Sequence, residues 1–243
     1  MNRIYLSPHF DDVAFSCGGL VWEQTRSGEN VSIWTICSGE PPAEPISRYA
    51  ESLHERWETG PDAVAVRRVE DINSNRLMGA SSLNFSIPDA IYRRSILDAA
   101  PLYTADAELF TELLGEENQL VESLREDLEQ ALPQECDLVC PLALGGHVDH
   151  RLVRSAAEQL GRRLWYYADY PYTIEPDEDI HEDDRGIKHR VYPVSEAGLY
   201  IWQQAVAAHS SQISTFWSSS NEMQEAIRAY WEPIKGVRLW RFP

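Results

Sequence analysis

The chain begins with RIYLSPHFDD at residues 3–12, a short apolar run followed at once by a histidine and two adjacent carboxylates. The apolar run has the length and composition of a buried strand, and Pro8 ends its hydrogen-bonding ladder. His9, Asp11 and Asp12 therefore fall just past the carboxyl end of that strand. Ligands bind at this edge of an open α/β sheet. The stretch predicts the first strand of such a sheet and a chemically active cluster beside it.

The rest of the chain predicts alternating strands and helices. Residues 13–26 have helical spacing and residues 31–37 form a β-branched strand, so the chain starts with a βαβ unit and a parallel sheet. Downstream patterns predict helices over 47–58, 62–78, 119–132, 149–163, 195–215 and 221–231, and strands over 81–85, 137–141, 164–167 and 189–194. Residues 90–118 read as an insertion of loop and short helix. The pattern predicts an α/β, Rossmann-like three-layer sandwich with a mostly parallel sheet, as a single domain over 1–243.

Composition excludes several classes of function. Lys and Arg number 21 and Asp and Glu number 39, which gives a net charge of −18. Such a surface repels phosphate backbones and anionic membranes, so a nucleic-acid partner is not expected. We expect no secretory signal, and we find no apolar run that could cross a bilayer. We expect Cys17, Cys37, Cys136 and Cys140 to be reduced, mostly core residues of a cytoplasmic protein.

The first cluster has the residue types of a metal site. His9 and Asp12 are three positions apart, a spacing that places both side chains on one side of a helical turn. Neutral imidazole and carboxylate are suitable ligands for Zn²⁺. Asp11 lies between them and points elsewhere, so it is free to act as a base. The alternative is that Asp11 or Asp12 simply caps a helix.

The second cluster, GGHVDH at residues 145–150, follows the strand predicted over 137–141. His147 and His150 are again three apart, so one can ligate a metal while the other faces the reacting group. Three protein ligands leave one coordination position open, which is typical of a catalytic zinc. A lone His-x-x-His is more often a surface or packing motif. The occurrence of both clusters at two predicted strand ends favours the metal site.

These two motifs resemble the signature of the PIG-L or LmbE-like zinc-dependent deacetylases, Pro-His-x-Asp-Asp early in the chain and His-x-x-His later. Here they read PHFDD at residues 8–12 and HVDH at residues 147–150. The resemblance implies that His9, Asp12 and His150 bind the metal. Further similarity in RRVE at 67–70, DYPY at 169–172 and HSSQ at 209–212 extends the match over most of the chain.

The resemblance also implies roles for five other residues. Asp11 would be the general base, and a protonated His147 would stabilise the tetrahedral intermediate. Asp149 would orient His147 or a metal ligand. Arg67 and Asp89 would bind the sugar, although Arg67 could instead pair with a glutamate on its own helix, and an aspartate such as Asp89 is common in turns.

Two departures from the family pattern stand out. Phe10 replaces the usual proline and keeps an apolar filler. Gly145 stands where some members carry a tyrosine that polarises the carbonyl, so a second donor to the oxyanion would have to come from elsewhere.

The resemblance implies a hydrolase that removes an N-acetyl or N-acyl group from an N-acetylglucosamine-type sugar or sugar conjugate through metal-activated water. Two alternatives stay open: a zinc amidohydrolase acting on a non-sugar N-acyl amine, and a non-catalytic sugar-binding relative. Zn²⁺ is the expected cofactor, and Fe²⁺ fits the same ligands. The expected partner is a small-molecule N-acetylated sugar, and a homo-oligomer is left open.

Three smaller expectations concern packing and exposure. Gly18 and Gly19 would let another backbone approach the first helix closely. His54, His181 and His189 lie among charged residues and are expected at the surface, and the acidic residues 175–184 are expected to form a surface loop.

Overall fold

The computed structural model describes residues 2–42, 45–172 and 186–243. His181 and the acidic stretch 175–184 lie outside the described residues. The described strands are β1 (Asn2–Ser7), β2 (Asn30–Thr35), β3 (Ser81–Asn84), β4 (Asp137–Pro141), β5 (Leu164–Tyr167), β6 (Lys188–Pro193) and β7 (Gly236–Arg241). The described helices are α1 (Asp12–Arg26), α2 (Arg48–Arg56), α3 (Ala63–Met78), α4 (Asn118–Ala131), α5 (Val148–Glu158), α7 (Glu196–Ala207), α8 (Ser210–Phe216) and α9 (Ser220–Trp231).

The strands form one sheet in the order β3-β2-β1-β4-β5-β7-β6. Strands β1 to β5 pair in parallel, whereas β7 runs antiparallel to both β5 and β6. This confirms the predicted α/β class with a mostly parallel sheet. The sequence did not predict β7. Val237 and Leu239 pack on one side of the sheet and Trp240 on the other, so apolar residues face both sides and the strict alternation of a half-buried strand is broken at Trp240.

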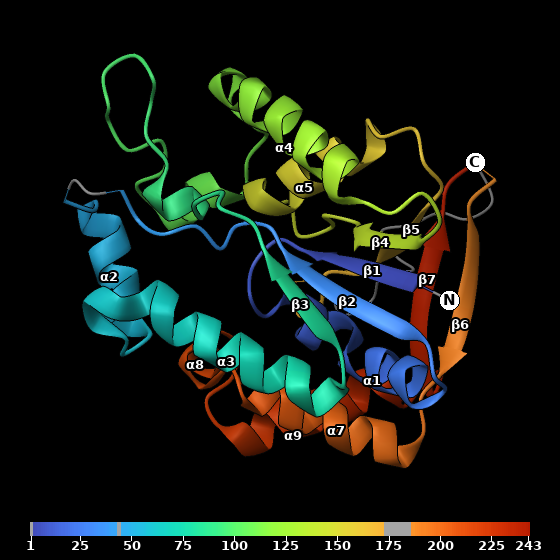
Figure 1. The fold of residues 1–243 in the computed structure, drawn as a ribbon. Coiled ribbons are helices and arrows are strands. Elements are labelled where there is room, and N and C mark those ends of the chain that lie inside the picture. Colours follow the sequence, from blue (N-terminus) through green and yellow to red (C-terminus); the bar gives the residue numbers. More distant parts are fainter. Residues whose placement is uncertain (1, 43–44, 173–185) are drawn as a thin grey trace.

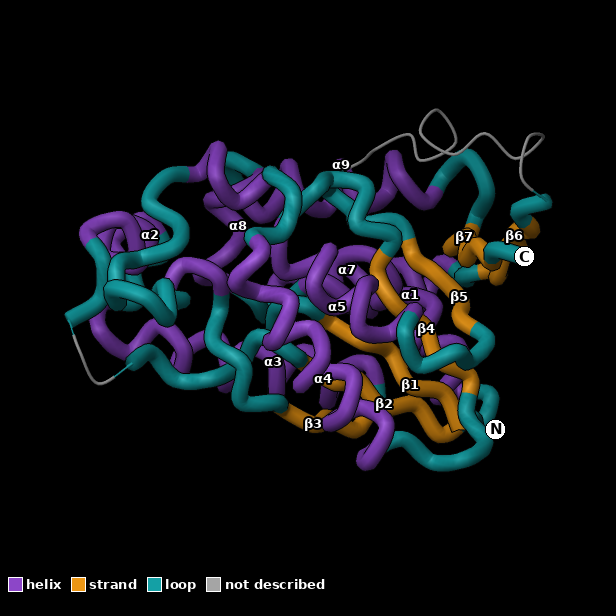
Figure 2. Tube along the Cα trace, turned by 90° about the horizontal axis from the view of Figure 1, so that it is seen from above, coloured by secondary structure: helices purple, strands orange, loops and turns teal. Residues whose placement is uncertain are grey.

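Helices cover both faces of the sheet. In Figure 1, α1, α3, α7 and α9 lie below the sheet and α4 and α5 lie above it, and Figure 2 shows the same arrangement from above. Successive side chains of β1 point to opposite faces. Tyr5 belongs to the core between the sheet and helices α1 and α7. Ile4 and Leu6 belong to the core on the opposite face, between the sheet and helices α4 and α5. Hence the sandwich has the three layers that the alternating pattern predicts.

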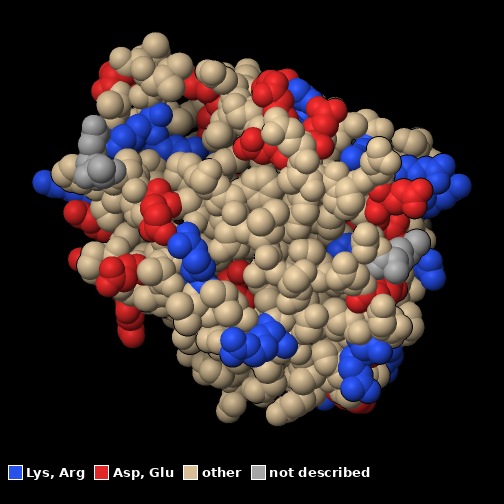
Figure 3. Space-filling view, in the orientation of Figure 1, with Lys and Arg blue, Asp and Glu red and all other residues tan. Residues whose placement is uncertain are grey.

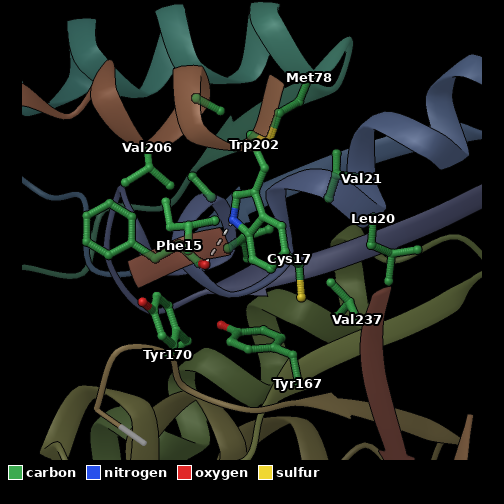
Figure 4. Packing of buried hydrophobic residues seen from close by; sticks show 14 of the residues in the cluster. Phe15, Cys17, Leu20, Val21, Met78, Tyr167, Tyr170, Trp202, Val206 and Val237 are labelled. Carbon is green, nitrogen blue, oxygen red and sulfur yellow. Dashed lines mark hydrogen bonds between the residues drawn. The ribbon is translucent and has the colours of Figure 1, made fainter. Parts of the chain in front are cut away.

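The two glycines of α1 let α7 pack closely against it, and an aromatic side chain of α7 fills the space beside them. A Cβ atom on Gly18 would lie 2.7 Å from Trp202 Cδ1, and one on Gly19 would lie 2.9 Å from Trp202 Cε3. Trp202 is fully buried, and its indole nitrogen donates to the carbonyl oxygen of Phe15 at 3.1 Å (Figure 4). The close approach expected at these glycines is present: α7 packs closely against α1, and its Trp202 indole fills the space that a side chain at 18 or 19 would take.

The predicted helix over 195–215 is two helices, because the chain breaks at His209. α7 ends at Ala207 and α8 begins at Ser210. Glu70 of α3 accepts hydrogen bonds from the Ser211 backbone N–H and from the Ser210 hydroxyl, both at 2.8 Å. These bonds satisfy groups at a helix start that a continuous helix would pair internally. Helix α5 also ends earlier than predicted, at Glu158.

Histidine exposure differs from the sequence expectation at one position. His54 is buried at 4% exposed, and its Nε2 lies 2.6 Å from the Tyr92 hydroxyl, so the surface prediction was wrong there. His189 is exposed as expected.

The four cysteines are free thiols, and three of them are buried while Cys136 is partly exposed.

None of the helices described in the structure is long and apolar enough to span a bilayer. Figure 3 shows charged side chains of both signs around a broad uncharged area on one face of the molecule.

The sheet topology places both sequence motifs in one crevice. From β1 the chain crosses to β2 on one side, and β4 lies on the other side, so the strand order reverses between β1 and β4. Ligands bind outside the carboxyl ends of the strands at such a point. His9 follows β1, His147 follows β4 and Asp169 follows β5.

Candidate metal centre and active site

Three side chains from the two motifs converge at this crevice. His9 Nδ1 lies 3.1 Å from Asp12 Oδ2, and His150 Nε2 lies 3.2 Å from Asp12 Oδ1. One ligand atom from each residue lies within 4.8 Å of the others, and all three residues are buried. His9 comes from the loop after β1, Asp12 begins α1 and His150 sits in the first turn of α5. The arrangement is suited to one divalent metal ion with three protein ligands.

Two further carboxylates fix the orientation of the imidazoles. His9 Nε2 lies 2.9 Å from Asp149 Oδ2, and His150 Nδ1 lies 2.6 Å from Asp169 Oδ1. Each ring therefore presents its other nitrogen to Asp12. A carboxylate behind an imidazole fixes the tautomer and raises the basicity of the ligand nitrogen.

The electrostatics of these groups fit a cation between them. Burial opposes a charged His150, but Asp12 and Asp169 outweigh it and raise its pKa to about 9. Burial likewise opposes a charged His9, while Asp12 raises the pKa of that ring. The two histidines hold the pKa of Asp12 well below its usual range despite burial. His150 Nε2 makes no hydrogen bond to any residue that the structure describes, so this nitrogen is available to a metal.

A second triad, His9, His147 and Asp149, also has ligand atoms close together. Here the carboxylate of Asp149 already serves as an acceptor. It takes the Ala90 backbone N–H at 3.0 Å, a hydrogen bond from Arg93, and the Nε2 contact of His9. Because its oxygens are occupied, this triad is the poorer metal site.

Asp11 lies beside the candidate metal ligands without joining them. It stands at the cap position of α1, yet its side chain makes no capping hydrogen bond. Its Oδ1 lies 3.5 Å from Arg67 Nη2. Burial raises the pKa of Asp11, Arg67 opposes this and Asp12 adds to it, so the net direction is upward. A carboxylate with a raised pKa near a metal site is suited to moving protons.

His147 lines the same pocket. Its Nδ1 accepts the backbone N–H of Asp149 at 3.2 Å, so the proton of a neutral ring lies on Nε2. Burial, His9 and His150 lower its pKa well below the usual range. A lowered pKa favours the neutral form, whose Nε2–H can donate a hydrogen bond.

Arg67 and Asp89 lie together in the pocket. Arg67 Nη1 is 3.4 Å from Asp89 Oδ2, and its guanidinium lies 4.9 Å from the centre of the Trp57 ring. Glu70 is taken up by α8, so Arg67 points into the pocket rather than to its own helix. Asp89 also accepts the Ile91 N–H at 3.2 Å, and so combines the turn role with the pocket position.

The pocket has a volume of about 300 Å³ and a strongly aromatic wall, to which Tyr49, Trp57, Phe110, Tyr172 and Phe216 contribute. A Cβ atom on Gly145 would lie 2.5 Å from Tyr172 Cβ. Tyr172, from the loop after β5, therefore occupies the space that a side chain at position 145 would take.

The sequence placed Asp169 and Tyr172 in the family-like stretch DYPY at 169–172, but did not assign Asp169 to a ligand imidazole or place Tyr172 beside Gly145. Asp169 follows a predicted strand in the same way as His9 does, and this position could have revealed it. Tyr172 lies in the same family-like stretch, but its place beside Gly145 depends on how the loop after β5 folds back.

Comparisons with known proteins identify the family of the chain. Residues 4–160 match the family model PIG-L, GlcNAc-PI de-N-acetylase. The 2'-N-acetylparomamine deacetylase of Niallia circulans is 29% identical over 263 residues, which cover 98% of this chain and 93% of the relative.

Two solved structures share the fold. The zinc-inhibited form of teicoplanin deacetylase Orf2 is 23% identical, with a TM-score of 0.84 and coverage of 99% of this chain and 97% of that one. The A40926 pseudoaglycone deacetylase Dbv21 is 26% identical, with a TM-score of 0.75 and coverage of 99% and 96%. Because the family model spans both sequence motifs and the fold matches throughout, this chain is a member of the PIG-L (GlcNAc-PI de-N-acetylase) family.

Proposed function

We propose that this chain is a zinc-dependent hydrolase that removes the acetyl group from an N-acetylated amino sugar or its conjugate. The observation that carries the proposal is the buried His9–Asp12–His150 cluster with an unligated carboxylate, Asp11, beside it. A metal site that spares a neighbouring acid/base has the composition of a hydrolytic centre rather than of a structural one.

His9, Asp12 and His150 would hold the metal, which supplies a water of lowered pKa and a Lewis acid for the amide carbonyl. Asp11 takes the proton from the attacking water. His147 donates from Nε2 to the oxyanion that forms on the substrate carbonyl.

The proton held by Asp11 then passes to the amine as the C–N bond breaks, which leaves acetate and a free amino sugar. A carboxyl group whose pKa is raised can both accept and return a proton near neutral pH. Tyr172 is our candidate for the second oxyanion donor. It lines the pocket beside Gly145, and its ring centre lies 5.4 Å from that of His150.

Arg67 and Asp89 are our candidates for binding sugar hydroxyl groups, because both are buried at the pocket and carry charge. The aromatic wall beyond them can stack against the apolar face of a sugar ring or a larger conjugate. The names of the relatives, a deacetylase of 2'-N-acetylparomamine and a deacetylase of the A40926 pseudoaglycone, support an acetylated amino sugar or its conjugate as the substrate class.

Asp89→Asn should raise KM with a smaller change in kcat. The amide can still accept the Ile91 N–H, so the turn survives, but it loses the charge that would bind substrate hydroxyls. Hydrogen bonds to charged groups contribute about 1.5–3 kcal/mol, which corresponds to a roughly 10- to 150-fold fall in kcat/KM.

Steady-state kinetics measure this change, and Asp98→Asn is the matched control. Asp98 accepts the Ala100 N–H in the same local geometry but lies on an exposed loop. Equal kinetics for Asp89→Asn and wild type would remove Asp89 from the substrate site.

The proposal as a whole is tested by measuring acetate and free amine after incubation with N-acetylated amino sugars, their conjugates and simple N-acetyl amines. We expect release from the amino sugars by zinc-loaded protein, loss of release after chelation, and recovery on adding Zn²⁺. Release only from the non-sugar amines would favour the amidohydrolase alternative. Sugar binding without release would favour the non-catalytic alternative.

A further inference from the structure

We infer that Arg93 and Glu117 are positioning residues for the metal site, and that they act by holding Asp149 behind the ligand His9. The inference rests on the proposed metal site and extends it into residues 90–118, which carry no part of the two sequence motifs. Neither residue lines the catalytic pocket.

A continuous chain of buried hydrogen bonds links the two regions. His9 Nε2 contacts Asp149 Oδ2, and Arg93 Nη2 donates to the other oxygen of Asp149. Arg93 Nη1 donates to Glu117 Oε1 at 2.5 Å, and the Tyr103 hydroxyl donates to Glu117 Oε2 at the same distance. The candidate metal ligand His9 is therefore connected by successive hydrogen bonds to four residues: Asp149, Arg93, Glu117 and Tyr103.

Because the network is buried, each of its charged groups needs a partner of opposite charge. Asp149 is 0% exposed, Glu117 2% and Arg93 6%. A charge taken out of water costs several kcal/mol unless it is paired, and one unpaired member leaves its partner uncompensated. The planar guanidinium of Arg93 suits the task, because its two ends bind two carboxylates at once in fixed directions. Lysine has one charged group and cannot reproduce both directions.

The network has two consequences for the metal site. It fixes the carboxylate of Asp149 so that His9 is held in one tautomer with Nδ1 directed at Asp12. It also keeps Asp149 occupied, so that the competing triad of His9, His147 and Asp149 does not take the metal. Arg93 follows the short helical turn Ala90–Tyr92, which Asp89 caps, so the same segment carries a pocket residue and the support of a metal ligand.

The test is zinc affinity, measured by chelator competition on Arg93→Lys and Glu117→Gln. Loss of a group that orients a metal ligand typically lowers metal affinity about 10- to 100-fold. We expect a fall in that range for Arg93→Lys and a smaller fall for Glu117→Gln, whose amide still accepts a hydrogen bond. The visible absorption of the Co²⁺-loaded proteins should change in the same order, because it reports the ligand geometry.

Arg94→Lys is the matched control. Arg94 is the next residue and bonds backbone carbonyls of Ala99 and Pro45, away from the metal ligands. It should keep the wild-type zinc affinity. Thermal unfolding of each metal-free variant checks folding. If Arg93→Lys does not fold, Glu117→Gln and Tyr103→Phe carry the test, since the latter removes a single hydroxyl.

Zinc affinities within about twofold of wild type in the folded variants would overturn the inference while leaving the proposed function intact. Failure of the wild-type protein itself to bind zinc or to release acetate would instead count against the proposed function. A lower unfolding temperature with unchanged zinc affinity would assign Arg93 and Glu117 a purely structural role.

Discussion

Asp11→Asn should lower kcat by about 10²- to 10⁴-fold and leave the metal in place. The amide has nearly the shape of the carboxylate but cannot take a proton from water. Asp11 is not in the candidate ligand set, and its side chain makes no capping bond that the helix would lose. Metal content, measured on the purified variant, should therefore equal that of wild type while the release of acetate nearly stops.

The measurement pairs steady-state kinetics with the zinc-to-protein ratio and a thermal melt. Activity within a few-fold of wild type would show that another group accepts the proton. Loss of zinc from the Asp11 variant would show that this carboxylate is a ligand, and the roles of the adjacent aspartates would then have to be exchanged.

The early part of the fold could be predicted from sequence because its signals are local. The apolar run before Pro8 lies within one strand, and the helical spacing of residues 13–26 lies within one helix. The break between α7 and α8 could not be predicted in this way. It depends on Glu70, which lies 140 residues before Ser210 and supplies the acceptor that the new helix start needs.

The candidate metal ligands were predictable for a similar reason. His9 and Asp12 share one motif, and their spacing alone indicates a common side. The carboxylates that orient the ligands were harder to assign. Asp149 meets His9 across 140 positions, and the sequence left open whether it orients His147 or a ligand. The structure places its side chain on His9 and only its backbone on His147.

Arg93 and Glu117 were beyond sequence reasoning for a different reason. Residues 90–118 show neither a helical nor a strand period, so nothing local tells an arginine that pairs inside the protein from one on the surface. Arg93 and Arg94 are adjacent and identical, yet Arg93 is buried against Asp149 and Arg94 bonds carbonyls near the surface. Only the folded structure shows that the two arginines have different partners.

Asp12→Asn changes the neighbouring carboxylate in the same way and should greatly weaken metal binding. Both oxygens of Asp12 face candidate ligand nitrogens, one at 3.1 Å from His9 Nδ1 and one at 3.2 Å from His150 Nε2. An amide keeps one oxygen, which can still accept the His9 backbone N–H, but it loses the negative charge that favours a cation between the rings. Zinc affinity should fall more than the about 10- to 100-fold expected for a group that only orients a ligand.

The two isosteric variants control for one another, because they alter neighbouring residues in the same turn by the same chemical change. Chelator competition should give near wild-type zinc affinity for Asp11→Asn and a large loss for Asp12→Asn, while neither releases acetate at the wild-type rate. Excess Zn²⁺ should restore part of the activity of Asp12→Asn by mass action, since its base is intact, and none of that of Asp11→Asn. If excess zinc instead rescued Asp11→Asn and left Asp12→Asn inactive, Asp12 would be the proton carrier and Asp11 the ligand.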